Sequence, residues 1–119
     1  MAIGAKMEMV SDFIAALFDP EDLVEIRMLP SGKREWVKAS GFIDLVPTLE
    51  SNNLDGQNIY FGANPRKRKG GQAKDVAIFR CLFVDFDNVS PQYARQVLSD
   101  AALPEPTAEV HSGHGVHFY

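Results

Sequence analysis

The spacing of hydrophobic positions predicts a helix followed by a pair of strands in the N-terminal third of the chain. Within 8–18 the hydrophobic side chains recur every three or four residues, at Val10, Phe13, Ile14, Leu17 and Phe18, which is typical of an amphipathic helix. Residues 23–29 alternate instead, with Val24, Ile26 and Met28 sharing one side. Turn residues at 30–33 predict a hairpin whose returning strand covers 35–39.

The middle of the chain predicts a short helix and two further strands. We expect a helix at 44–51, with Pro47 in its first turn, and a compact strand at 59–62. Residues 77–87 form a long and mostly hydrophobic run, which predicts a central strand covered on both faces. Cys81 lies in this run, so we expect a buried structural thiol rather than a nucleophile.

The C-terminal part predicts one more helix and a strand pair. Ser90 is expected to be the N-cap of a helix that has Pro91 at its first position and ends at 103–104. Strands are expected at 108–111 and 116–119. The order of elements predicts one α/β (α+β) domain over residues 1–119, built around a single mixed sheet. The last strand reaches the end of the chain, so we expect 1–119 to be the N-terminal portion of a longer domain.

Composition indicates a globular domain and gives no sign of a membrane role. The chain has 119 residues, of which 45% are hydrophobic and 24% are charged, which suits one domain with its own core. It contains neither an apolar stretch of membrane-spanning length nor a signal peptide. The single cysteine cannot form an internal disulfide and fits a reducing, cytoplasmic setting.

The charge distribution singles out one loop. The net charge is −4, yet five cations and no acid lie between Arg66 and Lys74. Arginine forks match phosphate oxygens, and paired glycines follow the run Arg66, Lys67, Arg68 and Lys69. The loop is therefore a candidate site for the triphosphate of a nucleotide or the backbone of a nucleic acid. A solvated surface loop is the alternative.

Two carboxylates, Asp85 and Asp87, lie two residues apart in the hydrophobic run. Alternate side chains of a strand share a face, so the two aspartates are expected to project together. Like charges on a buried strand are costly unless a cation neutralises them. Mg²⁺ or Mn²⁺, which take oxygen ligands and keep positions open for substrate phosphates, would suit this pair. Capping of a turn by Asp87, or exposure of both residues, is the alternative.

A glycine-rich turn, Ser112-Gly113-His114-Gly115-Val116-His117, follows about a helix's length later. Its glycines allow close backbone approach, which suits a turn whose amides hold an anion. The Ser112 hydroxyl and the His117 imidazole are further candidate donors. The alternative is a tight hairpin whose glycines serve only its geometry.

The two motifs together resemble those of the archaeo-eukaryotic primase superfamily, specifically the primase-polymerase domains of phages and mobile elements. In that family an Asp-X-Asp strand is the first motif and a Ser-Gly-X-Gly-X-His turn is the second, as at 85–87 and 112–117. Segments 18–27 and 60–66 are also similar to such domains, so the resemblance runs from about Phe18 to the C-terminus. It implies an RRM-like sheet with flanking helices.

The resemblance also implies an activity, which is template-directed nucleotidyl transfer during replication of a phage or plasmid. Asp85 and Asp87 would hold catalytic Mg²⁺ or Mn²⁺, and the NTP or dNTP would contact Ser112, Gly113, Gly115, His117 and Arg66. Arg66, Lys67, Arg68 and Lys69 would contact a single-stranded DNA template, and a helicase domain or subunit is an expected partner. The family's third motif, a later acidic residue, would fall after Tyr119, so the chain alone is expected to be inactive.

Two other functions remain open from the residues alone. His114 and His117 with Tyr119 suggest a rolling-circle replication initiator nuclease, although a glycine interrupts the expected His-X-His spacing. A non-catalytic, sheet-based nucleic-acid-binding module is the other possibility, with Tyr60, Phe61 and Phe83 as stacking residues.

Overall fold

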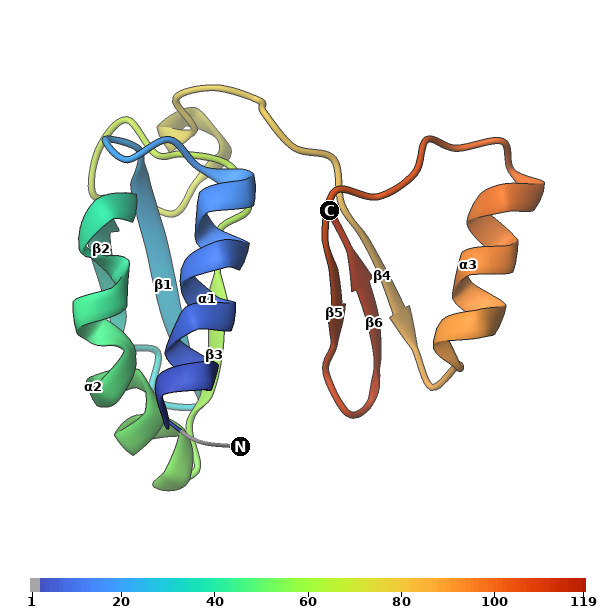
Figure 1. Ribbon diagram of the computed structural model, residues 1–119. Coiled ribbons are helices and arrows are strands. Elements are labelled where there is room, and N and C mark those ends of the chain that lie inside the picture. The colour runs from blue at the N-terminus through green and yellow to red at the C-terminus, as the bar shows by residue number, and fades with distance from the viewer. Residues whose placement is uncertain (1–2) are drawn as a thin grey trace. The chain divides into compact units, whose positions relative to one another are not determined.

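The computed structural model describes residues 3–119, with side chains described from Met7 onward (Figure 1). This part of the chain is an α+β structure with three α-helices and two antiparallel sheets of three strands each. It divides into two compact units, residues 1–80 and 81–119. No helix among the described residues is long and apolar enough to cross a membrane.

Unit 1 consists of one antiparallel sheet, two α-helices and two short 3₁₀ turns. Its strands are β1 (Leu23–Leu29), β2 (Arg34–Lys38) and β3 (Asn58–Phe61), arranged in the order β2-β1-β3. Its helices are α1 (Ile3–Leu17) and α2 (Phe42–Leu54), and the 3₁₀ turns are η1 (Ala39–Gly41) and η2 (Ala73–Asp75). Figure 1 shows α1 and α2 side by side over the sheet.

The alternation of β1 determines which face of the unit 1 sheet is covered. Val24, Ile26 and Met28 have no exposed surface, and burial of each contributes about 1.5–3 kcal/mol. Phe61 of β3 lies on the same face, because its ring makes an edge-to-face contact with Phe13 of α1 at 5.4 Å between centroids. The helices therefore cover this face, and the alternate residues of β1 point to the outer face.

Unit 2 is a smaller sheet covered by one helix. It comprises β4 (Val84–Asp87), α3 (Pro91–Asp100), β5 (Glu109–His111) and β6 (Gly115–Phe118), with strand order β4-β6-β5. Its core consists of Ala94, Leu98, Val116 and Phe118, with Phe86 and Val89 packed against them. The rings of Phe86 and Phe118 make an edge-to-face contact at 5.9 Å.

Several local predictions are confirmed. The strand at 23–29 has the predicted bounds, because the apolar Val24, Ile26 and Met28 alternate with residues that include the charged Glu25 and Arg27. Ser90 is the N-cap of α3 and accepts a hydrogen bond from the Tyr93 amide at 3.2 Å, with Pro91 at the first helical position. The helix predicted at 44–51 is longer, so Pro47 lies inside α2 rather than in its first turn.

The expected α/β (α+β) class is confirmed, but two antiparallel sheets take the place of a mixed sheet, and the long central strand is wrong. Only Val84–Asp87 of the run 77–87 forms a strand, and residues 77–83 lie outside both sheets. Phe79 and Leu82 are 71% and 77% exposed. Cys81, expected to be buried, is of intermediate exposure. The hydrophobic composition of residues 77–83 is therefore not sufficient to predict a strand, because no neighbouring strand within the described residues pairs with this segment.

We predict that Ser90→Ala destabilises α3 by about 1 kcal/mol, because the Tyr93 amide loses its capping acceptor. Amide hydrogen exchange in α3, measured together with chemical denaturation, would record the loss. Ser99→Ala in the same helix, at an exposed interior position, is the matched control and should not destabilise it. Equal protection in the two variants would contradict the capping role.

Candidate functional site

The candidate site in unit 2 is built on the β4–β6 ladder. Asp85 lies directly opposite His117, and Asp87 lies opposite Gly115. Directly opposite residues of an antiparallel pair project to the same face. The Asp85 Oδ1 and His117 Nε2 atoms are 3.0 Å apart, so the ladder register brings the two predicted motifs into direct contact.

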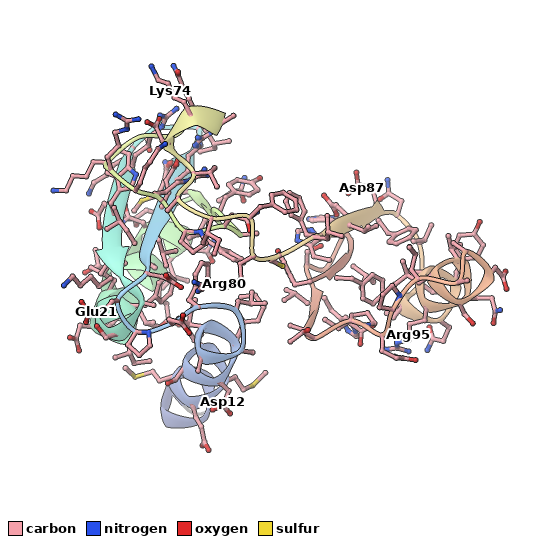
Figure 2. All side chains as sticks on the ribbon, turned by 90° about the horizontal axis from the view of Figure 1, so that it is seen from above. Asp12, Glu21, Lys74, Arg80, Asp87 and Arg95 are labelled. Carbon is pink, nitrogen blue, oxygen red and sulfur yellow. The ribbon has the colours of Figure 1, made fainter. Side chains whose placement is uncertain are left out.

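The core of unit 2 explains why these side chains share the other face. Phe86, Val116 and Phe118 pack toward α3, so strand alternation directs Asp85, Asp87 and His117 away from that helix. The Asp85 side chain is 51% exposed and Asp87 is also exposed; Figure 2 labels Asp87 on its strand. The expectation that the carboxylates lie on a buried strand is therefore wrong, and solvent screens their mutual repulsion.

Tyr119 extends the Asp85–His117 contact. Its hydroxyl lies 3.4 Å from His117 Nδ1, and its ring lies 6.3 Å from that of Phe83. His117 Nε2 approaches a carboxylate oxygen of Asp85, while on the other side of the ring Nδ1 shares a hydrogen bond with the Tyr119 hydroxyl whose direction depends on the imidazole tautomer. The chain of contacts is thus Tyr119 to His117 to Asp85.

The environment of Tyr119 affects its ionisation. Partial burial raises the pKa of the Tyr119 phenol, and the negative charges of Asp85 and the Cys81 thiolate raise it further. The sequence had suggested Tyr119 only as a nuclease nucleophile, and its link to His117 was missed. The available signal was their spacing of two residues along one strand, which places both on the same face.

Steric constraints explain why glycine occupies positions 113 and 115 of the turn. Gly113 has a φ of +87°, a conformation that favours glycine. A Cβ at Gly115 would lie 1.8 Å from the Phe86 carbonyl oxygen, so no side chain fits there. The Ser112 hydroxyl donates to the Gly115 carbonyl and accepts from the His114 amide, both at 3.3 Å. Ser112 therefore stabilises the turn itself.

The donor set of this face suits a hard divalent cation. No group of three His, Cys, Asp or Glu residues that could hold a metal occurs in the described part of the chain. Mg²⁺ and Mn²⁺, however, are commonly bound by one or two carboxylates together with water and substrate phosphates. Asp85 and Asp87 supply these two carboxylates, and His117 Nε2 lies 3.0 Å from the first of them.

The predicted basic loop lies in the other unit, and two of its five cations, Arg66 and Arg68, form ion pairs with acids. Arg66 Nε is 3.3 Å from Glu25 Oε2, and the Arg66 side chain is only 14% exposed. Arg68 Nε is 2.8 Å from Asp75 Oδ1. Lys67 and Lys69 are exposed. The loop therefore presents its lysines to solvent and directs Arg66 to a buried acid, which sequence reasoning had not paired with it.

Comparison with known proteins yielded no family model, no curated protein and no solved structure that matches the chain.

We predict that Asp85→Asn lowers the pKa of Tyr119, because it removes a negative charge that opposes phenolate formation. Burial should still keep this pKa above the ordinary tyrosine value. A pH titration of ¹³C-labelled tyrosine rings, followed by NMR, would measure it. Asp87→Asn is the matched control and should leave the Tyr119 pKa unchanged; equal shifts in both variants would contradict the specific contact.

Proposed function

We propose that this chain supplies the metal- and nucleotide-binding elements of a nucleotidyltransferase of the primase-polymerase class. The observation that carries the proposal is the β4–β6 register, which pairs Asp85 with His117 at 3.0 Å and places Asp87 on the same open face. Catalysis of phosphoryl transfer depends on positioning and electrostatics. Carboxylates, an imidazole and a glycine-rich turn supply groups of the kind that this task needs.

In this proposal Asp85 and Asp87 would hold Mg²⁺ or Mn²⁺, and the metal would supply Lewis-acid activation of a hydroxyl and charge stabilisation for a pyrophosphate leaving group. His117 would accompany the Asp85 carboxylate at the site, since its Nε2 atom lies 3.0 Å from Asp85 Oδ1. An imidazole N–H group can donate a hydrogen bond to a phosphate oxygen, so His117 would also contact the nucleotide. Tyr119 holds the imidazole from its other side.

The glycine-rich turn would lie beside the phosphates of the incoming NTP or dNTP. Gly113 and Gly115 add no side chain to it, and the turn is connected to the end of β4 by a hydrogen bond from the Asn88 amide to the His114 carbonyl at 2.7 Å. This connection couples the position of the turn to that of Asp87. A single-stranded DNA template and a helicase partner belong to the same proposal.

The nuclease alternative has less support. A tyrosine nucleophile benefits from a lowered pKa, because the phenolate is the attacking form. The pKa of Tyr119 is instead raised by burial and by Asp85. His114 lies in the turn, outside β5 and β6, whereas His117 lies within β6.

We predict that the chain binds a non-hydrolysable nucleoside triphosphate in the presence of Mn²⁺, and that Asp85→Asn/Asp87→Asn weakens this binding by about tenfold or more. Loss of groups that only orient a metal ligand already costs about 10–100-fold, so loss of both carboxylates should cost at least as much. Isothermal titration calorimetry would measure the binding.

The control variant also removes two negative charges from unit 2, but at residues outside the proposed metal site. Asp100→Asn/Glu105→Gln replaces two exposed acids outside β4 and should bind the nucleotide like the unsubstituted chain. Electron paramagnetic resonance of Mn²⁺ without nucleotide gives a second readout of the carboxylates. Metal-dependent binding that survives in Asp85→Asn/Asp87→Asn, or the absence of nucleotide binding, would contradict the proposal.

A further inference from the structure

The outer face of the unit 1 sheet carries a basic and aromatic row that the proposed function does not use. Arg27 of β1 lies directly opposite Arg34 of β2 on one side and Tyr60 of β3 on the other. Directly opposite residues share a face, and this is the face away from α1 and α2. The three side chains therefore form a row across the sheet, which we call the Arg-Tyr row.

The positive charge of this row exceeds the acid available to it. Arg27 Nη2 is 2.8 Å from Glu25 Oε1, and Arg66 reaches the other oxygen of the same carboxylate. In the described part of the chain no ion pair involves Arg34. One buried carboxylate thus pairs with two guanidinium groups, those of Arg27 and Arg66. Arg34 adds a further positive charge directly opposite Arg27, and like charges in that position are destabilising.

A glycine brings these groups together. A Cβ built on Gly71 would lie 2.8 Å from Arg34 Nη1, 2.9 Å from Arg27 Nη2 and 3.1 Å from Glu25 Oε1. Both guanidinium groups therefore converge on the Gly71 backbone. Beside it, the Trp36 indole donates to the Gly70 carbonyl at 3.3 Å. The loop that contains Gly70 and Gly71 thus covers the outer face of the sheet near Glu25. The Arg-Tyr row lies at the edge of this covered area.

The row is accessible to a ligand. The Arg27 side chain is 37% exposed, Tyr60 is 48% exposed, and Arg34 is exposed. The exposed Lys67 and Lys69 belong to the same loop. Lys74 lies in η2, which Figure 2 shows on the side of unit 1 away from α1. Lys74 and the Arg-Tyr row therefore both lie on the side of unit 1 away from α1.

We propose that the Arg-Tyr row binds single-stranded nucleic acid, with backbone phosphates on the solvent-exposed sides of Arg27 and Arg34 and a base stacked on Tyr60. Guanidinium forks match phosphate oxygens, and an exposed ring beside a basic surface is the arrangement that single strands use. A duplex keeps its bases stacked internally and cannot use Tyr60 in this way. The inference rests on the proposed function, which includes a single-stranded template, and assigns it a surface; binding at this surface requires neither metal nor nucleoside triphosphate.

Fluorescence anisotropy tests this binding with the full chain and a labelled oligothymidylate of about twelve nucleotides, within the range for one such site. EDTA is present throughout, so the Asp85 and Asp87 site cannot contribute. Asp85→Asn/Asp87→Asn should bind the strand like the unsubstituted chain, which separates this test from that of the proposed function. We expect Tyr60→Ala to weaken binding by about fivefold or more, and Tyr60→Phe to retain it.

Arg34→Gln is expected to weaken binding and to reduce the slope of log K against log salt by about 0.7, the value for one phosphate contact on a single strand. Lys33→Gln is the matched control. It removes the same charge from the same hairpin, at a residue that pairs with Glu35 at 3.4 Å, and it should leave both quantities unchanged. Circular dichroism would verify the fold of each variant.

Several outcomes would overturn the proposal. They are the absence of binding to the oligothymidylate, equal weakening by Lys33→Gln and Arg34→Gln, and unchanged affinity in Tyr60→Ala. Equally tight binding of a duplex of the same length would also overturn the proposal, because it would show that the surface contacts only the nucleic-acid backbone. Preferential single-strand binding that depends on both Arg34 and the Tyr60 ring would support the proposal.

Discussion

The burial of Glu25 constrains the rest of unit 1. Its carboxylate is only 2% exposed, and an uncompensated buried charge costs several kcal/mol. Arg27 supplies one cation from the same strand, and Arg66 supplies the second from the segment after β3. Compensation of this acid therefore holds that segment against the outer face of the sheet. A backbone bridge between Leu23 and Arg66 reinforces the contact.

Unit 2 separates its structural and chemical residues by strand parity. Phe86, Val116 and Phe118 belong to the face that packs on α3, and the residues between them carry the polar contact of Asp85 with His117. Neither face requires a long loop or an unusual backbone to position its side chains. The pleat of two paired strands is enough, with Gly115 allowing the close approach to the Phe86 carbonyl.

How well the sequence predicted each feature depended on the range of the interactions behind it. The strand at 23–29 and the Ser90 cap follow from neighbouring residues, and both are confirmed. The pairing of Arg66 with Glu25 joins residues far apart in the chain, which no local pattern reveals. The long strand at 77–87 was wrong because a hydrophobic run indicates affinity for apolar neighbours and does not specify a partner strand. The exposure of Asp85 was mispredicted for the same reason.

The pairing of Asp85 with His117 has a further consequence for variation in this protein. Side chains repeat every two residues along a strand, so a slip of β6 by one position would turn His117 toward the helix and expose Val116. That slip would expose a residue that is fully buried. A change of register between β4 and β6 would consequently destabilise the fold, whatever its effect on the chemistry of the site. Selection for a well-packed core would by itself preserve the relative placement of the two polar side chains.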